Sequence, residues 1–531
     1  MDKKETPLTA LHTGATVAET YRAAFEQFPD RVALVLPDGS HWTYAGLQQR
    51  VHRMARALQA LGLRHQDGLA ILTGNRPEAL VVLIACAWLG LRQTALHPLG
   101  ALDDQAFVLQ DAGIAALVVD PRYAERGQAL QERGQQEGTP LRHVLSLGPS
   151  GLDDDLSAAS AAHSGAALPI ASRPEDIYRI TYTGGTTGRP KGVVHRHRTT
   201  LTMTLQQLAG WEWPEELRFL IATPISHAGG AMVLPTLLRG GTLVLLDGYQ
   251  PERFLQAVQQ HRITATFLVP TQIYGLLDHP GLDHWDRSSL RYVLYGASPM
   301  APARLAEAIQ RFGPLFGQLY GQAEAPMTIS YLRKDAHDLA RPERLQSCGR
   351  PLPGNQVRLL DPQGQEVATG EVGELCVRSP LVMEGYLNRP DATQEAFAGG
   401  WLHTGDMARR DEGGYLYLVD RAKDMVITGG FNVYSSEVEA CLALHPAVAQ
   451  SAVIGMPDAK WGEAVVALVV LKPGASATPQ ALMDFVHAHK GALHTPKLLR
   501  LEPQLPVTPL GKIDKKALRA RFWDGQARQV G

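Results

Sequence analysis

Between Val32 and Leu319, short runs of aliphatic and β-branched residues alternate with longer amphipathic stretches, and this alternation limits the fold more than any other feature. The runs are VALVL, LAILT, ALVVD, HVLSL, TLVLLD, TATFLV and RYVLYG. A strand that is followed by about a dozen helical residues and a further strand has to cross over and pair in parallel. We therefore predict a layered α/β body, with helices covering the sheets and ligands at the carboxyl ends of the strands.

The later part of the chain has a different pattern. After about Ser347, short alternating strands rich in glycine favour an antiparallel or barrel-like unit. Beyond Asp424 the sequence is typical of a compact α+β module, in which Ser436 and Glu439 have the S-x-x-E spacing of a capping box that opens a helix. The strand-like runs SAVIGM and AVVALVVL follow. The small, polar stretch 148–167 is expected to be a surface loop.

Charge and hydropathy exclude several classes of function. Lys and Arg total 51 and Asp and Glu total 53, and the net charge of −2 gives no surplus to bind nucleic acid or an anionic membrane. The longest apolar run, 80–91, is well short of the roughly 20 residues that a membrane span needs. It follows the helix-start signal Asn75-Arg76-Pro77, so we predict a buried helix and no membrane span. The N-terminus lacks the apolar segment of a secretory signal, and the expected compartment is the cytoplasm.

Cysteine and histidine spacing predicts no metal centre of the zinc type. The four cysteines have no C-x-x-C pair and no histidine at ligand spacing, and they are Cys86, Cys348, Cys376 and Cys441. We expect neither a disulfide framework nor a zinc site. His195 and His197 form an H-x-H that we expect to be a solvated basic stretch, and we expect His403 to be structural.

The strongest local motif is TYTGGTTGRPKG, residues 181–192, directly after the strand-like IYRITY. Its glycines let backbone N–H groups approach a polyphosphate, its threonines add hydroxyl donors and its lysine adds a cation. This predicted phosphate cradle consists of Thr183, Gly184, Gly185, Thr186, Thr187, Gly188 and Lys191. Two residues separate the last glycine from the lysine, so the spacing is not that of a P-loop. Taken alone, the motif is also typical of a flexible surface loop.

Four further segments hold side chains suited to nucleotide chemistry. LYGQAEAP, 319–326, offers Tyr320 for stacking on a base and Glu324 for holding Mg²⁺. WLHTGD, 401–406, offers Asp406 on a glycine turn as an acceptor for both hydroxyls of a ribose. The segment 421–439 combines charge with paired glycines, and PLGKIDKK offers Lys512 after a glycine. Singly, each is also typical of an ordinary turn or a solvated lysine.

In this order, the five motifs resemble those of the acyl-adenylate-forming superfamily, which contains acyl- and aryl-CoA synthetases, adenylation domains and firefly-type luciferases. The resemblance extends over essentially the whole chain. It implies a large N-terminal domain, residues 1–422, made of two α/β subdomains plus a barrel-like subdomain. It also implies a small mobile α+β domain, residues 423–531, that rotates between two half-reactions, and the use of ATP, Mg²⁺ and coenzyme A.

The same resemblance implies roles for individual residues. Glu324 would be the Mg²⁺-linked acid, Lys512 the lysine of adenylation and Lys423 the hinge, with Lys191 as a further catalytic cation. The remaining ATP and AMP contacts outside the cradle would be Gly296, Ala297, Ser298, Tyr320, Gly321, Asp406 and Arg421. The acyl pocket would be lined by His227, Gly229, Gly230, Ala231 and Gln322. The CoA arm would pass Gly429, Gly430 and Trp461.

Together these assignments predict an ATP-dependent carboxylic acid–CoA ligase that acts through an acyl-AMP intermediate. The segment ATPISHAGGAMVL lacks the acidic residue with which amino-acid-activating relatives pair an ammonium group, so the small-molecule acid is not an α-amino acid. The small residues that follow His227 leave volume on a pocket wall and predict a hydrophobic, bulky or ring-bearing acid.

Two departures from the family pattern leave alternatives open. Gly185 replaces the serine of TSGTTG, and Ala323 replaces the threonine before the glutamate, so two phosphate-facing hydroxyls are lost. One alternative is a thiolation-only enzyme that receives acyl-AMP made elsewhere. Others are a standalone adenylation enzyme that loads a carrier protein, a luciferase, and a nucleotide or acyl-CoA sensor without turnover. The presence of Lys512 argues against the sensor, because a binding module does not need it.

Overall fold

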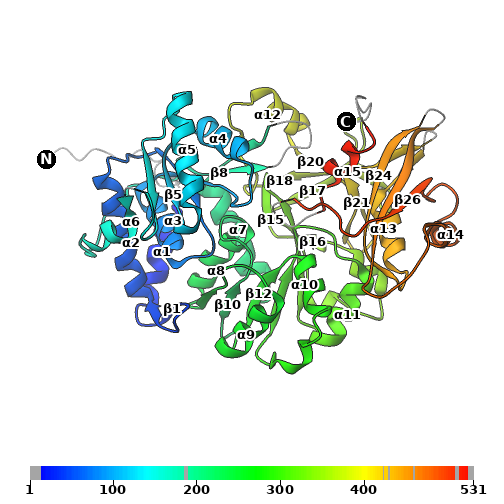
Figure 1. The fold of residues 1–531 in the computed structure, drawn as a ribbon, viewed down its shortest axis with the longest axis horizontal. Coiled ribbons are helices and arrows are strands. Elements are labelled where there is room, and N and C mark those ends of the chain that lie inside the picture. Colours follow the sequence, from blue (N-terminus) through cyan, green and yellow to red (C-terminus); the bar gives the residue numbers. More distant parts are fainter. Residues whose placement is uncertain are drawn as a thin grey trace.

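The computed structural model describes residues 14–152, 154–183, 189–421, 424–428, 431–458, 461–508 and 513–523. These residues form four sheets. Figure 1 shows the N-terminal helices at one end of the molecule and the C-terminal sheet at the other, with the remaining sheets between them. Within the described residues, no helix is long and apolar enough to cross a membrane.

The first α/β subdomain is built on an eight-stranded sheet with the order β19-β9-β8-β4-β3-β5-β6-β7. The strands from β8 to β7 in this order run parallel, and β9 and β19 add an antiparallel edge. The strands are β3 Gly68–Leu72, β4 Arg92–Ala95, β5 Ile114–Val119, β6 His143–Ser146, β7 Asp154–Asp155, β8 Ile177–Thr183, β9 Lys191–Arg196 and β19 Gly385–Tyr386. The helices are α2 Tyr44–Ala60, α3 Pro77–Leu89, α4 Leu102–Asp111, α5 Ala124–Glu137 and α6 Leu156–Ala161.

The second α/β subdomain is built on a nine-stranded sheet with the order β16-β15-β14-β13-β12-β10-β11-β1-β2. Its central strands, from β14 to β1, are parallel. The strands are β1 Val32–Val35, β2 His41–Thr43, β10 Arg218–Ile221, β11 Thr242–Leu245, β12 Ala265–Leu268, β13 Tyr292–Tyr295, β14 Phe316–Gln322, β15 Ala325–Leu332 and β16 Arg350–Pro351. The helices are α1 Val17–Gln27, α7 His197–Gly210, α8 Val233–Leu238, α9 Pro251–His261, α10 Pro270–Leu277 and α11 Pro302–Phe312.

One hydrophobic core joins the two sheets. It contains Ile71 of β3 and Phe219 of β10 together with residues of α1, α2, α3 and α8. Asn75, which follows β3, reinforces this junction, because its side-chain amide donates to the carbonyls of Thr223 and Leu246, both at 3.0 Å. The two parallel sheets therefore meet near the carboxyl ends of their strands, where ligands of α/β folds bind.

The last two sheets have the antiparallel and α+β character that the sequence predicts. The third has the order β17-β18-β20-β21, all antiparallel, and the fourth the order β23-β22-β25-β24 with β26 parallel to β25. Their strands are β17 Gln356–Leu360, β18 Val372–Arg378, β20 Leu402–Arg410, β21 Leu416–Arg421, β22 Val426–Thr428, β23 Phe431–Val433, β24 Val448–Asp458, β25 Gly462–Leu471 and β26 Leu498–Leu501. The helices are α12 Pro390–Ala396, α13 Ser435–Ala443, α14 Pro479–Lys490 and α15 Lys515–Ala520.

The apolar run at residues 80–91 forms the buried helix that we predicted. Helix α3 begins with Pro77 at its first turn and ends at Gly90, which has left-handed backbone geometry. The proline costs no hydrogen bond at that position, and the glycine adopts a positive φ without a Cβ clash.

Two local predictions are wrong. The stretch 148–167 contains β7 and the short helix α6, whose first turn Asp155 caps by accepting from Ala158 N–H. The capping box at α13 is also absent. The Ser436 hydroxyl donates to the Val419 carbonyl, and Glu439 accepts from Val453 N–H at 2.7 Å and pairs with Lys515 at 2.8 Å. Tertiary partners have replaced the local cap.

Candidate active site

Strands β8 and β9 form the hairpin that carries the predicted phosphate cradle. Thr183 at the end of β8 pairs with Lys191 at the start of β9, and both are half-buried. The connecting segment therefore joins two antiparallel strands, whereas a P-loop joins a strand to a helix. The predicted cradle residues Gly184, Gly185, Thr186, Thr187 and Gly188 lie outside the described residues.

Tyr386 connects two of the predicted catalytic residues. Lys191 Nζ lies 4.9 Å from the centroid of the Tyr386 ring, and the Tyr386 hydroxyl donates to Glu324 Oε1 at 2.8 Å. Burial raises the pKa of Tyr386, and Glu324 raises it further, so the hydroxyl stays a donor at neutral pH. The sequence analysis missed Tyr386. Only the pairing of β19 with β9 brings it to the site.

The predicted ribose acceptor is held in place by two neighbours. The Tyr320 hydroxyl donates to Asp406 Oδ2 at 2.6 Å, and Arg421 Nε lies 3.3 Å from Asp406 Oδ1. Asp406 is 7% exposed, and burial and Asp406 together raise the pKa of Tyr320. A carboxylate has about four acceptor sites. Asp406 therefore still has lone pairs for the two hydroxyls of a ribose.

Two of the glycines assigned to ATP and AMP contacts pack tightly against neighbouring strands. A Cβ on Gly296 would lie 2.5 Å from the Leu319 carbonyl oxygen, and Ala297 has a φ of 68°. Ser298 follows on the surface side. A Cβ on Gly321 would lie 2.2 Å from Met327 N, at the bulge that ends β14. These glycines permit close backbone approach.

Tyr320 has little surface left for a base. Its side chain is 8% exposed and belongs to the core that joins the two parallel sheets. Its hydroxyl is bonded to Asp406. The contact of Tyr320 with adenine stays a prediction.

Four of the five residues assigned to the acyl pocket lie in the turn that precedes α8, and the two glycines among them pack against the backbone. A Cβ on Gly229 would lie 2.3 Å from the Thr223 carbonyl oxygen, and a Cβ on Gly230 would lie 2.1 Å from that of Ile225. Their missing side chains face the backbone of the chain itself. The argument that these glycines leave volume for the acid is therefore wrong. The same argument still holds for Ala231, which lines a cavity.

A small cavity adjoins this turn. Ala231 and Gly230 line it together with residues of α3, α7 and α8, and its volume is about 40 Å³. That space is about the size of one water molecule and is smaller than the roughly 150 Å³ cavity that holds benzene. Gln322, at the end of β14, is half-buried and does not line it.

A second histidine that the sequence analysis missed lies next to His227. The ring centroids of His97 and His227 are 5.4 Å apart, and Ser226 Oγ lies 2.8 Å from His227 Nδ1. Burial lowers the pKa of His97. His97 lies two residues after the end of β4, a parallel strand. Ligands of α/β folds bind at the carboxyl ends of such strands, so this position was a signal that could have identified His97.

Several predicted residues of the C-terminal part lie outside the described residues, namely Lys423, Gly429, Gly430 and Lys512. Trp461 is described. It is 43% exposed, and its backbone N–H donates to Asp458 Oδ1 at 2.9 Å in the turn between β24 and β25. Its contact with a CoA arm stays a prediction.

One expectation about the histidines is wrong. His195 and His197 are 5% and 1% exposed, so the H-x-H is not a solvated stretch. Burial lowers the pKa of His195 to about 3 and that of His197 to about 4, and His197 Nδ1 accepts from Val17 N–H. Cys376 Sγ lies 3.5 Å from His403 Nδ1, and the two residues are brought together by the pairing of β18 with β20.

The chain matches known proteins over most of its length. Residues 21–387 match the AMP-binding enzyme family, and residues 437–512 match the AMP-binding enzyme C-terminal domain. A medium/long-chain-fatty-acid–CoA ligase, FadD8 of Mycobacterium tuberculosis (strain ATCC 25618 / H37Rv), is 47% identical, with coverage of 96% of this chain and 90% of that protein. A feruloyl-CoA synthase of Amycolatopsis sp is 38% identical, with coverage of 91% and 94%.

A solved structure has the same architecture. The amide bond synthetase McbA from Marinactinospora thermotolerans superimposes with a TM-score of 0.86 at 37% sequence identity. The match covers 95% of this chain and 100% of that one.

Proposed function

The chain belongs to the AMP-binding enzyme family, and from this premise we propose that it is an ATP-dependent carboxylic acid–CoA ligase that works through an acyl-AMP intermediate. One observation carries the proposal. The cation Lys191 and the acid Glu324 both contact Tyr386, and the acceptor Asp406 is bonded to Tyr320, four residues before Glu324, so that side chains from three sheets come together.

The chemistry requires this set of groups. A carboxylate that attacks the α-phosphorus of ATP brings two anions together, so the site has to neutralise charge and hold the reactants in line. Lys191 supplies a fixed cation, and Asp406 fixes the ribose so that the phosphates extend toward the hairpin. The loss of a hydroxyl at Gly185 and at Ala323 weakens phosphate contacts by about 1 to 3 kcal/mol each and does not remove any charged group.

The side chains fit a bound Mg²⁺. The Tyr386 hydroxyl donates to Glu324 Oε1, which orients the carboxylate toward β19 and its neighbour β9. Carboxylate oxygens together with substrate phosphates are the usual ligands of this ion, which would offset phosphate charge when bound. Glu324 would hold it.

The acid is proposed to be hydrophobic and bulky or ring-bearing. Support comes from the absence of an acidic side chain in segment 222–234 and from the small side chain of Ala231. One of the relatives is a feruloyl-CoA synthase, and another is a medium/long-chain-fatty-acid–CoA ligase. Because the cavity at Ala231 is about 40 Å³, a ring requires movement of the surrounding side chains.

Transfer to CoA is proposed to follow rotation of the C-terminal domain, residues 423–531, about Lys423. In this step Lys512 leaves the adenylation site, and Gly429, Gly430 and Trp461 border the path of the CoA arm. The fourth sheet begins only a few residues after the third ends, which suits a short hinge between domains.

The test is ATP–pyrophosphate exchange across fatty, aryl and polycyclic acids, followed by detection of product with CoA, a carrier protein and an amine offered in parallel. The amine is included because McbA is an amide bond synthetase. We expect exchange with ring-bearing acids and a thioester with CoA. Exchange with no acid, but thioester from supplied acyl-AMP, would instead identify a thiolation-only enzyme. Preference for acetate or butyrate would contradict the proposed acid class.

A further inference from the structure

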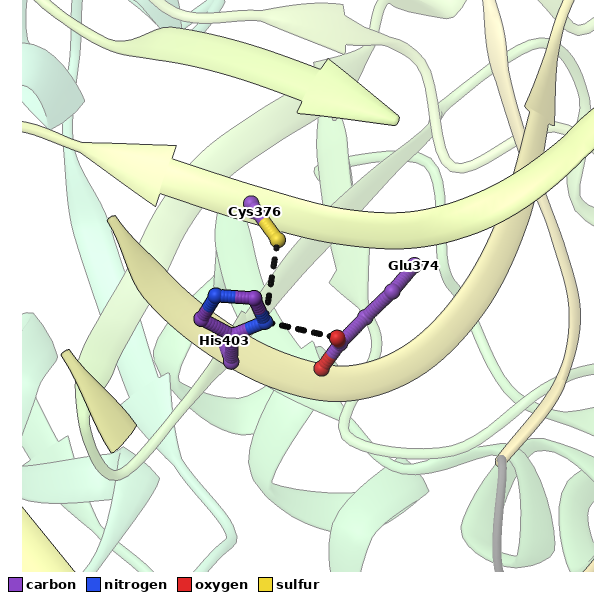
Figure 2. Close-up of side chains that lie close together, drawn as sticks. All are labelled: Glu374, Cys376 and His403. Atoms are coloured by element: carbon purple, nitrogen blue, oxygen red, sulfur yellow. Dashed lines mark hydrogen bonds and ion pairs between the residues drawn. The ribbon is translucent and has the colours of Figure 1, made fainter. Parts of the chain in front are cut away.

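Strands β18 and β20 bring three potential metal ligands together on one face of the third sheet. Glu374 and Cys376 are two residues apart on β18 and therefore point to the same side, and Cys376 lies directly opposite His403 on β20. Figure 2 shows the carboxylate, the thiol and the imidazole pointing toward one another. Their ligand atoms all lie within 4.8 Å of one another.

The imidazole of His403 has more acceptors around it than a neutral ring can satisfy. Nδ1 lies 2.7 Å from Glu374 Oε2, and Nε2 lies 3.2 Å from the Ala398 carbonyl oxygen. Both partners are acceptors, whereas a neutral imidazole has a single N–H. When Nε2 donates to the Ala398 carbonyl, the lone pair of Nδ1 faces the carboxylate, and a cation bound between Nδ1 and Oε2 would bond to both atoms.

The thiol makes the cluster suitable for a metal ion in particular. Cys376 Sγ lies 3.5 Å from the same Nδ1. Bond lengths of about 2.3 Å to sulfur and about 2.0 Å to nitrogen in a tetrahedral zinc site place these two ligand atoms about 3.5 Å apart. In such a site the nitrogen and the carboxylate oxygen lie about 3.3 Å apart. His403 Nδ1 and Glu374 Oε2 are 2.7 Å apart, so the carboxylate has to move away from the ring by about 0.6 Å.

Access and support are also present. Cys376 is fully buried, but the side chains of Glu374 and His403 are 27% and 26% exposed, which gives a hydrated ion a route to the ligands. A metal-bound histidine usually donates its other N–H to a backbone carbonyl, and Ala398 provides one.

We propose that Glu374, Cys376 and His403 form a binding site for a divalent cation of the zinc type. The ion bonds to Oε2, Sγ and Nδ1, the S–H bond of Cys376 breaks, and its proton leaves to solvent. A water molecule occupies the fourth position on the exposed side. Carboxylate, thiolate and imidazole together suit Zn²⁺ or Co²⁺, whereas Mg²⁺ prefers oxygen alone.

The site is connected to the residues described above. The other oxygen of Glu374, Oε1, accepts from Gly405 N–H at 2.9 Å, and Gly405 lies next to Asp406 on a bulge of β20. An ion at Oε2 leaves this bond in place and fixes the carboxylate from both ends. Metal binding is therefore expected to stabilise the bulge that carries Asp406.

The test is titration of the full-length protein with Co²⁺ in the absence of nucleotide. We expect one equivalent to bind with a thiolate-to-cobalt charge-transfer band in the near ultraviolet and with the visible spectrum of a four-coordinate ion. One equivalent of Zn²⁺ should abolish both signals. Because no ATP or acid is present, the result is independent of the proposed ligase activity.

Two variants assign the signal. C376S should lose the charge-transfer band, whereas C348S, which changes another buried cysteine outside the cluster, should retain it. H403N keeps the thiol and should weaken Co²⁺ binding at least 10-fold. A band that persists in C376S, or the lack of any band in the wild-type protein at micromolar Co²⁺, overturns the proposal, and the second outcome does not depend on whether the variants fold.

Discussion

At the scale of single residues, Asp406 is oriented before any nucleotide binds. Tyr320 donates a hydrogen bond to one of its oxygens, and Arg421 pairs with the other. The backbone N–H of Asp406 donates to the Thr404 hydroxyl at 3.1 Å. Such a group loses little conformational entropy on binding, because its rotamer is already fixed.

We predict that Asp406→Ala raises the KM for ATP by about 10- to 100-fold, because hydrogen bonds to a charged group contribute about 1.5 to 3 kcal/mol. Tyr320→Phe, which removes one fixing contact and keeps the carboxylate, should raise KM only several-fold. ATP–pyrophosphate exchange at varied ATP measures both. Equal effects of the two substitutions would contradict the role of Asp406 as a direct ribose acceptor.

Another residue-scale prediction concerns acid stability. His337 is 4% exposed, Nδ1 donates to the Arg333 carbonyl and Nε2 accepts from the Tyr295 hydroxyl at 3.0 Å. Burial lowers the pKa of His337 to about 4. His337 therefore takes up a proton near pH 6.5 in the unfolded chain but only near pH 4 in the folded chain. The stability that depends on neutral His337 is complete above pH 6.5 and is lost as pH falls toward 4.

His337→Gln keeps one donor and one acceptor but cannot titrate. Between pH 6.5 and 5.0 the unfolding free energy of the wild-type protein should fall by about 2 kcal/mol more than that of the variant, at about 1.4 kcal/mol per pH unit. Denaturant unfolding at several pH values measures this slope. His284→Gln, at an exposed position, serves as the control, and an unchanged slope in His337→Gln would contradict the prediction.

At the scale of elements, the turn before α8 combines a rigid part with an adjustable part. Gly229 and Gly230 press against the carbonyls of Thr223 and Ile225, and Asn75 Oδ1 accepts from Ile225 N–H at 2.8 Å. Ala231 comes next and lines the small cavity. The backbone of this turn is therefore fixed on one side, while its next side chain faces space.

We predict opposite effects for two neighbouring substitutions. Gly230→Ala should lower the unfolding free energy by about 1 to 3 kcal/mol, because its Cβ collides with backbone that Asn75 holds in place. Ala231→Val should leave stability within about 1 kcal/mol and lower kcat/KM for the largest acids relative to the smallest. Thermal unfolding and a panel of acids measure the two effects. An unchanged acid profile in Ala231→Val would remove Ala231 from the acyl pocket.

At the scale of the whole molecule, the proposed domain rotation separates the two half-reactions. The last strand of the third sheet ends at Arg421 and the first strand of the fourth begins at Val426. Contacts across this junction include the hydrogen bonds from Ser435 N–H to Asp420 Oδ2, at 2.5 Å, and from the Ser436 hydroxyl to the Val419 carbonyl, which a rotation has to break.

We predict that Lys512→Ala slows adenylation about 10²- to 10³-fold and leaves thioester formation from supplied acyl-AMP nearly unchanged, because its charge acts in the first transition state. Lys423→Pro should do the reverse, since a fixed φ hinders rotation. Lys497→Ala, an exposed lysine of the same domain, is the control. Single-turnover assays of each step decide, and equal losses in both steps for Lys512→Ala would mean that the lysine is structural.

The sequence by itself determined the parallel α/β body, because burial of a strand or helix leaves a local period in the chain. All seven aliphatic runs contain a strand, and the apolar run at 80–91 became α3. Strand β4, with the sequence RQTA, is not in an aliphatic run and was not predicted. Its Gln93 is buried, and the side-chain amide donates to the Leu83 carbonyl, so burial there depends on a tertiary partner that no local pattern contains.

The motifs likewise predict which short segments carry chemistry, since phosphate and ribose contacts need particular residue types close together in the chain. Only the tertiary structure decided which distant side chains complete the site. Tyr386 reaches Glu324 through the pairing of an edge strand, and His97 reaches His227 across the junction of two sheets. The ladder of β18 and β20 likewise places Cys376 opposite His403. Strand register and sheet packing set these contacts, and both depend on the whole chain rather than on local sequence.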